Sequence, residues 1–177
     1  MAESKRIKYD YDLISTDGKS EEINPELKKF MSKVSTTQTN TKIILTNNEK
    51  LRQLKEELPT SIGERQKSIS DTLSNITEEN IILQEKIKNS ISQNYDEFVK
   101  DLDVNSNILE QEKRIARNLH GATVKHFQDA MLDFQSIESD IKGVNQAMIV
   151  RSAEIAMSRK LSKEEQENIV NNPSVLN

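Results

Sequence analysis

The side chains of the chain that could best bind a metal ion or an anion lie in one stretch, RIARNLHGATVKHFQDAM, at residues 114–131. It contains both histidines, His120 and His126, which are six positions apart. Side chains on one face of a helix recur at three or four positions, so these two cannot bind one metal ion from a single helix. The chain also has no H-E-x-x-H motif. The histidines therefore do not predict a metal site.

The same stretch carries three basic residues, Arg114, Arg117 and Lys125. Acidic residues such as Glu112 and Asp129 flank them, and the net charge of the chain is −4. Binding to a nucleic-acid backbone requires concentrated positive charge. We therefore expect a solvated helix face here and no nucleic-acid partner.

Residue patterns for catalysis are also missing. The chain has no cysteine, no G-x-S-x-G nucleophile motif, and four glycines that do not form a phosphate-binding loop. A rod of helices offers no concave pocket with convergent polar groups. We expect no enzymatic activity, no cofactor and no metal.

The elements that carry these residues are predicted to be helices. Only four glycines, three prolines and 4% aromatic residues argue against a β-rich fold. Apolar residues recur by threes and fours over residues 24–58, 62–103 and 107–160, with Asn24 as a cap and Pro25 at the first helical position. At about 1.5 Å per residue these helices are about 50, 60 and 80 Å long. The expected fold class is all-α, an elongated antiparallel up-down-up three-helix bundle with an overhanging third helix.

The carboxy-terminal segment has its own helix signals. Ser162 and Glu165 form a capping box, and Asn172-Pro173 should end the short helix that follows. The expected division is a flexible amino-terminal tail over residues 1–22, a bundle over 23–160 and a linker over 161–177.

The heptad pattern also predicts which side chains form the core seam. His120 falls on this seam, where a histidine is usually a packed, hydrogen-bonded residue. The predicted seam consists of Phe30, Val34, Ile44, Leu51, Leu73, Ile76, Leu83, Ile87, His120, Phe127, Phe134, Ile137 and Ile141.

Polar residues interrupt this seam at Thr37, Thr41, Asn48, Asn80 and Thr123. They could lie at the edge of the seam, or they could be buried and fix the register of the helices at some loss of stability. A third interpretation is that they leave the bundle with a groove for another helix.

A second apolar row favours such a groove. Ile115 and Leu119 lie one position before the seam of the third helix, and Ile82 and Ile91 lie beside the seam of the second. With Met131 they form the predicted partner groove, which would receive an amphipathic helix. The competing interpretation is that they only widen the core stripe. If the groove is correct, Leu119→Asp should weaken binding more than folding.

These residues resemble a known family. The stretch at 114–131 is similar to the start of the third helix of the syntaxin amino-terminal domain. KFMSKV at 29–34 resembles the start of its first helix, and SDTLSNITEENIILQEKI at 70–87 resembles its second. SKEEQENIVNNPSVL at 162–176 resembles its linker, and the whole resemblance covers residues 24–176.

Syntaxins are Qa-type SNARE proteins of membrane fusion. The resemblance implies an Habc domain, a regulatory three-helix bundle that folds back onto the downstream SNARE helix and binds SM-family proteins. It is closest to the plasma-membrane branch, which implies a role in vesicle transport and exocytosis. The cognate SNARE proteins are implied as further partners.

The sequence departs from the family in three respects. Nothing after residue 161 has the heptads of a SNARE motif, there is no carboxy-terminal membrane anchor, and Gln166-Glu167 stands where the family linker often has Leu-Glu. No run approaches the roughly 18 apolar residues of a membrane span, and the start has no secretory signal. We expect a soluble, monomeric part of a longer protein that lies on the cytoplasmic face of a membrane. The alternative function is a structural coiled-coil protein that homo-oligomerises through its heptads.

Overall fold

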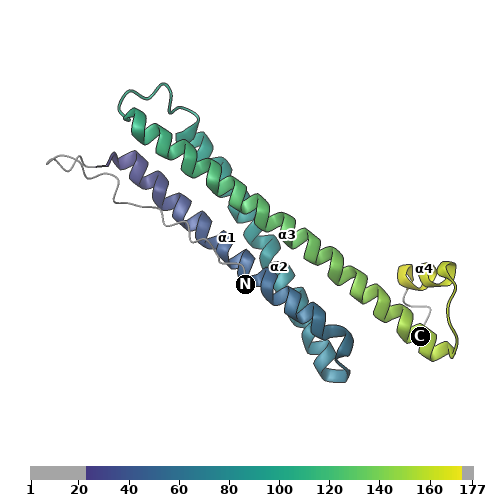
Figure 1. Ribbon diagram of the computed structural model, residues 1–177. Coiled ribbons are helices and arrows are strands. Elements are labelled where there is room, and N and C mark those ends of the chain that lie inside the picture. The colour runs from purple at the N-terminus through teal and green to yellow at the C-terminus, as the bar shows by residue number, and fades with distance from the viewer. Residues whose placement is uncertain (1–22, 173–177) are drawn as a thin grey trace, which may run out of the picture.

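The computed structural model describes residues 23–172, and helices make up almost all of this part of the chain (Figure 1). The predicted all-α class is confirmed for these residues, which contain no strand. The expected flexible tail over residues 1–22 and the last five residues of the expected linker lie outside the described part. The helices are α1 (Pro25–Glu57), α2 (Gly63–Asn94), α3 (Glu110–Met157) and α4 (Lys163–Asn171), with a 3₁₀ turn η2 (Leu58–Thr60) after α1 and a π-helical turn η3 (Tyr95–Val99) after α2.

Helices α1 and α2 run in opposite directions. The side-chain oxygens of Thr37 and Ser90 are 2.7 Å apart, while Glu57 at the end of α1 pairs with Arg65 at the start of α2. The reversal occurs at η2, where Pro59 removes a backbone N–H donor and so ends the helix.

Helix α3 runs in the same direction as α1. At their starts, the backbone N–H of Asn24 donates to Glu112 at 3.0 Å; further along, the Lys55 ammonium lies 3.1 Å from Asp140. Asn24 also caps α1 as predicted, because its side chain accepts from the backbone N–H of Glu26 at 2.8 Å. Helix α1 packs closely on both α2 and α3, whereas α2 and α3 contact each other less.

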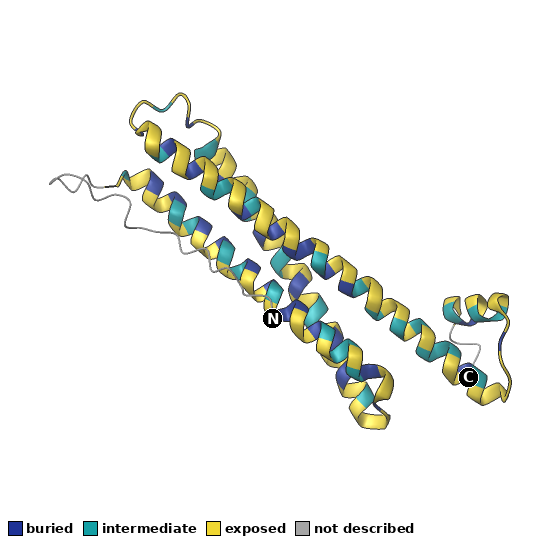
Figure 2. Cartoon of the chain, viewed as in Figure 1, coloured by how far each residue is buried: buried dark blue, intermediate teal, exposed yellow. Residues whose placement is uncertain are grey.

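Buried residues recur at intervals along the three long helices (dark blue in Figure 2), and the apolar ones form two clusters within the bundle. The amino-end cluster joins the first turns of α1 and α3 to the segment between α2 and α3, and the central cluster fills the middle of the bundle. The amino-end cluster contains Leu27, Phe30, Val34, Leu102, Ile108 and Ala116. The central cluster contains Ile44, Leu51, Leu58, Ile69, Leu73, Ile87, Phe127, Ala130, Met131, Phe134 and Ile137.

The second helix ends earlier than the sequence predicts. Instead of running to residue 103, α2 stops at Asn94 and continues as the π-helical turn η3. A π turn inserts an extra residue, which shifts the helical register. This shift brings Phe98 against Phe30 with ring centroids 4.8 Å apart, so the apolar pattern continues although the α-helix does not.

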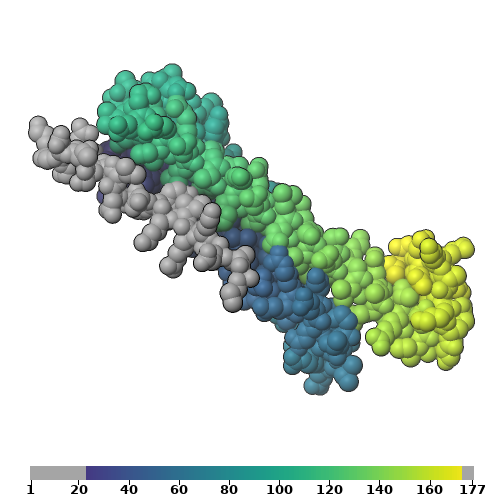
Figure 3. Space-filling model, in the orientation of Figure 1, coloured from purple at the N-terminus to yellow at the C-terminus, as the bar shows by residue number. Residues whose placement is uncertain are grey.

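The predicted capping box at the start of α4 is confirmed. The Ser162 hydroxyl accepts from the backbone N–H of Glu165, and the Glu165 carboxylate accepts from that of Ser162 at 2.8 Å. Ile169 of α4 is buried in a small cluster with Ala153 and Leu161, so α4 folds back on the end of α3. Figure 3 shows the elongated outline of the molecule, with α4 at this end.

Candidate functional site

The two histidines occupy different surroundings. His126 is exposed on α3. His120 is half-buried, its ring centroid is 5.6 Å from that of Tyr95 at the start of η3, and burial lowers the pKa of its imidazole. His120 therefore lies at the edge of the seam and not in the core, which corrects its expected place. No group of three or more possible metal ligands occurs among residues 23–172.

The basic cluster is part of the solvated surface of α3. Arg114, Arg117 and Lys125 are exposed, and Arg117 forms an ion pair with Asp103. Within the described residues, no helix has the length and apolar content to cross a membrane.

The structure buries most of the predicted core seam. Ile76, Leu83 and Ile141 are only partly buried, but each packs against the central cluster. The fully buried members are Phe30, Val34, Ile44, Leu51, Leu73, Ile87, Phe127, Phe134 and Ile137.

The polar residues of the seam are buried inside the bundle. Thr37 and Thr41 are each 1% exposed, and the hydroxyl of each donates to the backbone carbonyl four residues earlier at 3.0 Å. The Gln38 amide donates to the Thr123 hydroxyl at 3.3 Å and so connects α1 to α3. These contacts form a polar layer between the two apolar clusters, which excludes a position at the edge of the seam.

A chain of amides then connects all three long helices. Asn48 and Asn80 are each 0% exposed, and the Asn80 amide donates to the Asn48 side-chain oxygen at 3.1 Å. The Asn48 amide donates to the Ala130 carbonyl at 3.1 Å and to Asp133 at 2.9 Å. Asn47 donates to the Asn80 side-chain oxygen at 2.9 Å. Among residues 23–172, every buried side-chain polar atom has a partner. The layer therefore avoids the cost of unpaired buried groups and favours one helix register.

An open, mostly apolar groove runs between α2 and α3, because these helices contact each other less than either contacts α1. Its floor includes Phe127 and Met131, which are 6% and 8% exposed, while Leu132 on the rim is 66% exposed. We call this surface the α2–α3 groove. It is lined by Gln84, Lys88, Ile91, Ser92, Val124, Phe127, Gln128, Met131, Leu132 and Gln135.

Two of the five predicted groove residues, Ile91 and Met131, line the α2–α3 groove. Ile82 is 62% exposed and lies outside it, as does Ile115. Leu119 packs against the amino-end cluster, which corrects its expected place in the groove.

The groove lies on the other side of the α3 seam from the predicted row. Ile115 and Leu119 come one position before the seam, whereas lining residues such as Val124, Gln128 and Gln135 come one position after buried residues of the seam. One helical position is a rotation of about 100°. Val124 and Leu132 were therefore missed, because the heptad pattern does not specify on which side of α3 the second helix packs.

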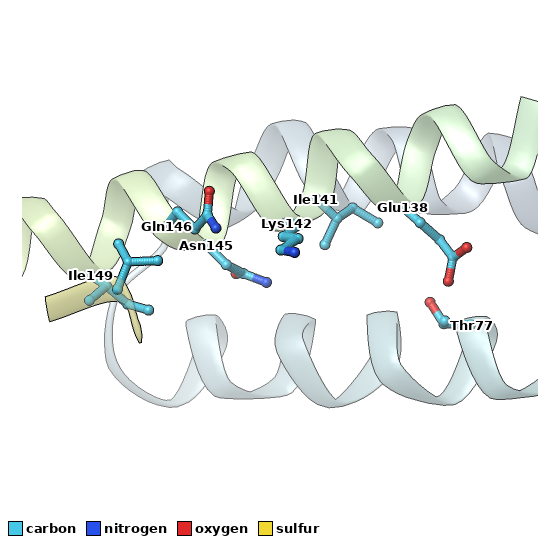
Figure 4. Close-up of a pocket in the computed structure, with 8 residues that line it drawn as sticks. Thr77, Glu138, Ile141, Lys142, Asn145, Gln146 and Ile149 are labelled. Carbon is cyan, nitrogen blue, oxygen red and sulfur yellow. The ribbon is translucent and has the colours of Figure 1, made fainter. Parts of the chain in front are cut away.

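A second depression continues along the same two helices toward α4 (Figure 4). Figure 4 shows Glu138 of α3 directed toward Thr77 of α2. Burial raises the pKa of the Glu138 carboxyl. We call this depression the distal hollow; it is lined by Thr77, Glu138, Ile141, Lys142, Asn145, Gln146, Ile149 and Val170.

Comparison with known proteins gives one result. The family model described as Syntaxin matches residues 24–176, which include the three long helices, both depressions and α4. No curated protein and no solved structure matches the chain.

Proposed function

Since the chain belongs to the syntaxin family, we propose that its three long helices form the amino-terminal Habc domain of a SNARE protein, an up-down-up regulatory bundle. The family consists of membrane-associated SNARE proteins, which have other SNARE proteins as partners, and it is not a family of enzymes. The regulatory role is our proposal.

The observation that supports this proposal most is the α2–α3 groove. An apolar floor between two helices, with a polar rim, fits an amphipathic helix that inserts its apolar face. We propose that the SNARE helix of the full-length parent lies in this groove and is held there in a closed state. A helix in the same chain has a high effective concentration, so a shallow groove is enough to hold it.

Closure of this kind is an equilibrium between two conformations. A partner that binds one conformation more tightly than the other shifts the balance by its difference in affinity. We propose that an SM-family protein is such a partner and that the protein acts in vesicle fusion on the cytoplasmic face of a plasma membrane or endomembrane. Titration of the full cytosolic region with a purified SM protein, followed by a fluorescent pair on the groove and the SNARE helix, measures this coupling.

The groove itself is tested by nuclear magnetic resonance. A peptide with the SNARE helix of the same gene is added to the isotope-labelled chain of 177 residues. We expect the largest shift changes at Ile91, Val124 and Leu132, and small ones at Ile82 and Ile115. Binding that instead shifts the outer faces of α1, or no binding at a peptide concentration of about 1 mM, which matches the effective concentration within one chain, would refute the proposed closed state.

We also propose that the isolated chain is a monomer, because its heptad seams pack against each other within one bundle. Light scattering should give a mass near 20.3 kDa. A dimer that persists on dilution would favour the structural coiled-coil function.

A further inference from the structure

Glu138 stands out among the acidic residues of α3 because its half-buried carboxylate points into an open depression, toward Thr77 of α2 (Figure 4). Among the described residues, none forms a hydrogen bond or ion pair with this carboxylate. Two other acidic side chains of α3 in this part of the bundle are paired, Asp133 with Arg52 and Asp140 with Lys55. A half-buried carboxylate without a partner loses hydration and gains nothing in return.

The walls of the distal hollow suit one type of side chain. Ile141, Ile149 and Val170 provide apolar surface, Thr77 places a hydroxyl opposite Glu138, and Asn145 provides a side-chain amide about two turns further along α3. Arginine and lysine place an aliphatic stem along apolar surface and a cationic head among acceptors. A hydrogen bond from such a head to a carboxylate is charge-assisted and therefore stronger than one between neutral groups.

We propose that the distal hollow binds one arginine or lysine side chain of the helix that occupies the α2–α3 groove, with Glu138 as its counter-ion. The inference rests on the proposed function, since it assumes an occupant of that groove. The positions allow it: Thr77 precedes Gln84 by seven residues on α2, a distance of about 10 Å, and Glu138 follows Gln135 by less than one turn of α3. A helix that lies in the groove therefore passes over the distal hollow.

Lys142 is the cation of the chain itself that could pair with Glu138 in place of an incoming side chain. It lies four residues later on α3 and lines the same hollow, but it forms no ion pair with Glu138. It is also the charged residue that faces Glu138 there, because α2 contributes Thr77 and α4 contributes Val170. An exposed pair at this spacing adds little stability, so Lys142 does not prevent an incoming cation from binding.

The first test measures affinity for the SNARE-helix peptide by calorimetry. We expect Glu138→Gln to weaken binding about fivefold or more, which corresponds to about 1 kcal/mol. The matched control is Asp129→Asn, which removes an exposed charge of the same helix outside the hollow and should leave the affinity unchanged. Each basic residue of the peptide is then changed to glutamine. One of these changes should lower the affinity for the wild-type chain but should not lower the affinity for Glu138→Gln any further.

The second test follows the Glu138 carboxyl by carbon NMR over a pH titration. Burial raises its pKa in the free chain, and a bound cation should lower it, so binding should strengthen as the pH rises through that pKa. If the peptide binds and Glu138→Gln behaves like Asp129→Asn, the inference is wrong while the proposed function stands. If the effect of Glu138→Gln on affinity disappears in Lys142→Met while no change in the peptide removes it, Lys142 is the counter-ion of Glu138 and the inference is again wrong. If the peptide does not bind the wild-type chain even at about 1 mM, the effective concentration within one chain, the proposed function itself fails.

Discussion

Replacement of Asn80 by alanine tests whether the buried amide chain acts as one unit. The change removes the donor that reaches the Asn48 side-chain oxygen at 3.1 Å and the acceptor that receives the Asn47 amide at 2.9 Å. Asn47 keeps Glu79 as an acceptor, also at 2.9 Å, but the Asn48 oxygen is left buried without a donor. Two lost hydrogen bonds and one unpaired acceptor together should cost about 3 kcal/mol of unfolding free energy. The bundle should remain folded, since domains of this size have stabilities of about 5–15 kcal/mol.

The informative quantity is the coupling with Asn48. Asn48→Ala should cost a similar amount, because it leaves the Asn80 amide unpaired, while Asp133 keeps its ion pair with Arg52. The double variant has neither unpaired group, so its loss should be about 2 kcal/mol smaller than the sum of the two single losses. Urea denaturation followed by circular dichroism at 222 nm measures all three. Additive losses, or single losses below about 0.5 kcal/mol, would show that these amides do not act as a unit.

Two further predictions concern the ends of the bundle. Leu119→Asp should lower the unfolding free energy by about 2 kcal/mol or more, because Leu119 packs against the amino-end cluster. Urea denaturation measures this loss. If peptide affinity falls while the unfolding free energy is unchanged, Leu119 belongs to the partner groove, as the sequence predicts. At the other end, the hydrogen bond from Arg159 holds the pKa of Glu165 at about 2, below its usual 4.5. Because the folded pKa is the lower one, this stabilisation of α4 is present above pH 4.5 and is lost as the pH falls toward 2. The methyl resonances of Ile169 should therefore change their shifts in this range in the wild type. In Glu165→Gln they should change less, because the Glu165 carboxyl no longer titrates, while Glu154, whose pKa is lowered by Lys160, still titrates beside this cluster.

The helices could be predicted because their signals are local. Heptad spacing, the cap at Asn24 and the box at Ser162 each depend on residues within a few turns of one another. The end of α2 could not be predicted in this way. The apolar pattern continues past Asn94 after a shift of register, which fits a break in the helix as well as a π turn. In the structure the shift is a π turn, and Phe98 packs against Phe30.

The groove could be predicted only in part, and the reason is geometric. The seam indicates which face of α3 is buried, but not whether α2 lies on one side of that face or the other. Leu119 and Val124 are both apolar residues beside the seam, and only the arrangement of three helices makes one a core residue and the other a groove residue. Glu138 carried no sequence signal, since a glutamate on a helix is usually solvated.

The most direct test of the proposed function compares two exposed aliphatic residues. Leu132 is 66% exposed and lines the α2–α3 groove, whereas Ile82 is 62% exposed and lies outside it. Because both side chains face solvent, Leu132→Asp and Ile82→Asp should leave folding intact. Urea denaturation of each variant checks that its unfolding free energy is unchanged. Calorimetry with the SNARE-helix peptide should then show at least a tenfold loss of affinity, about 1.4 kcal/mol, for Leu132→Asp and almost none for Ile82→Asp. Equal affinities for both variants would contradict the assignment of this groove as the site of the SNARE helix.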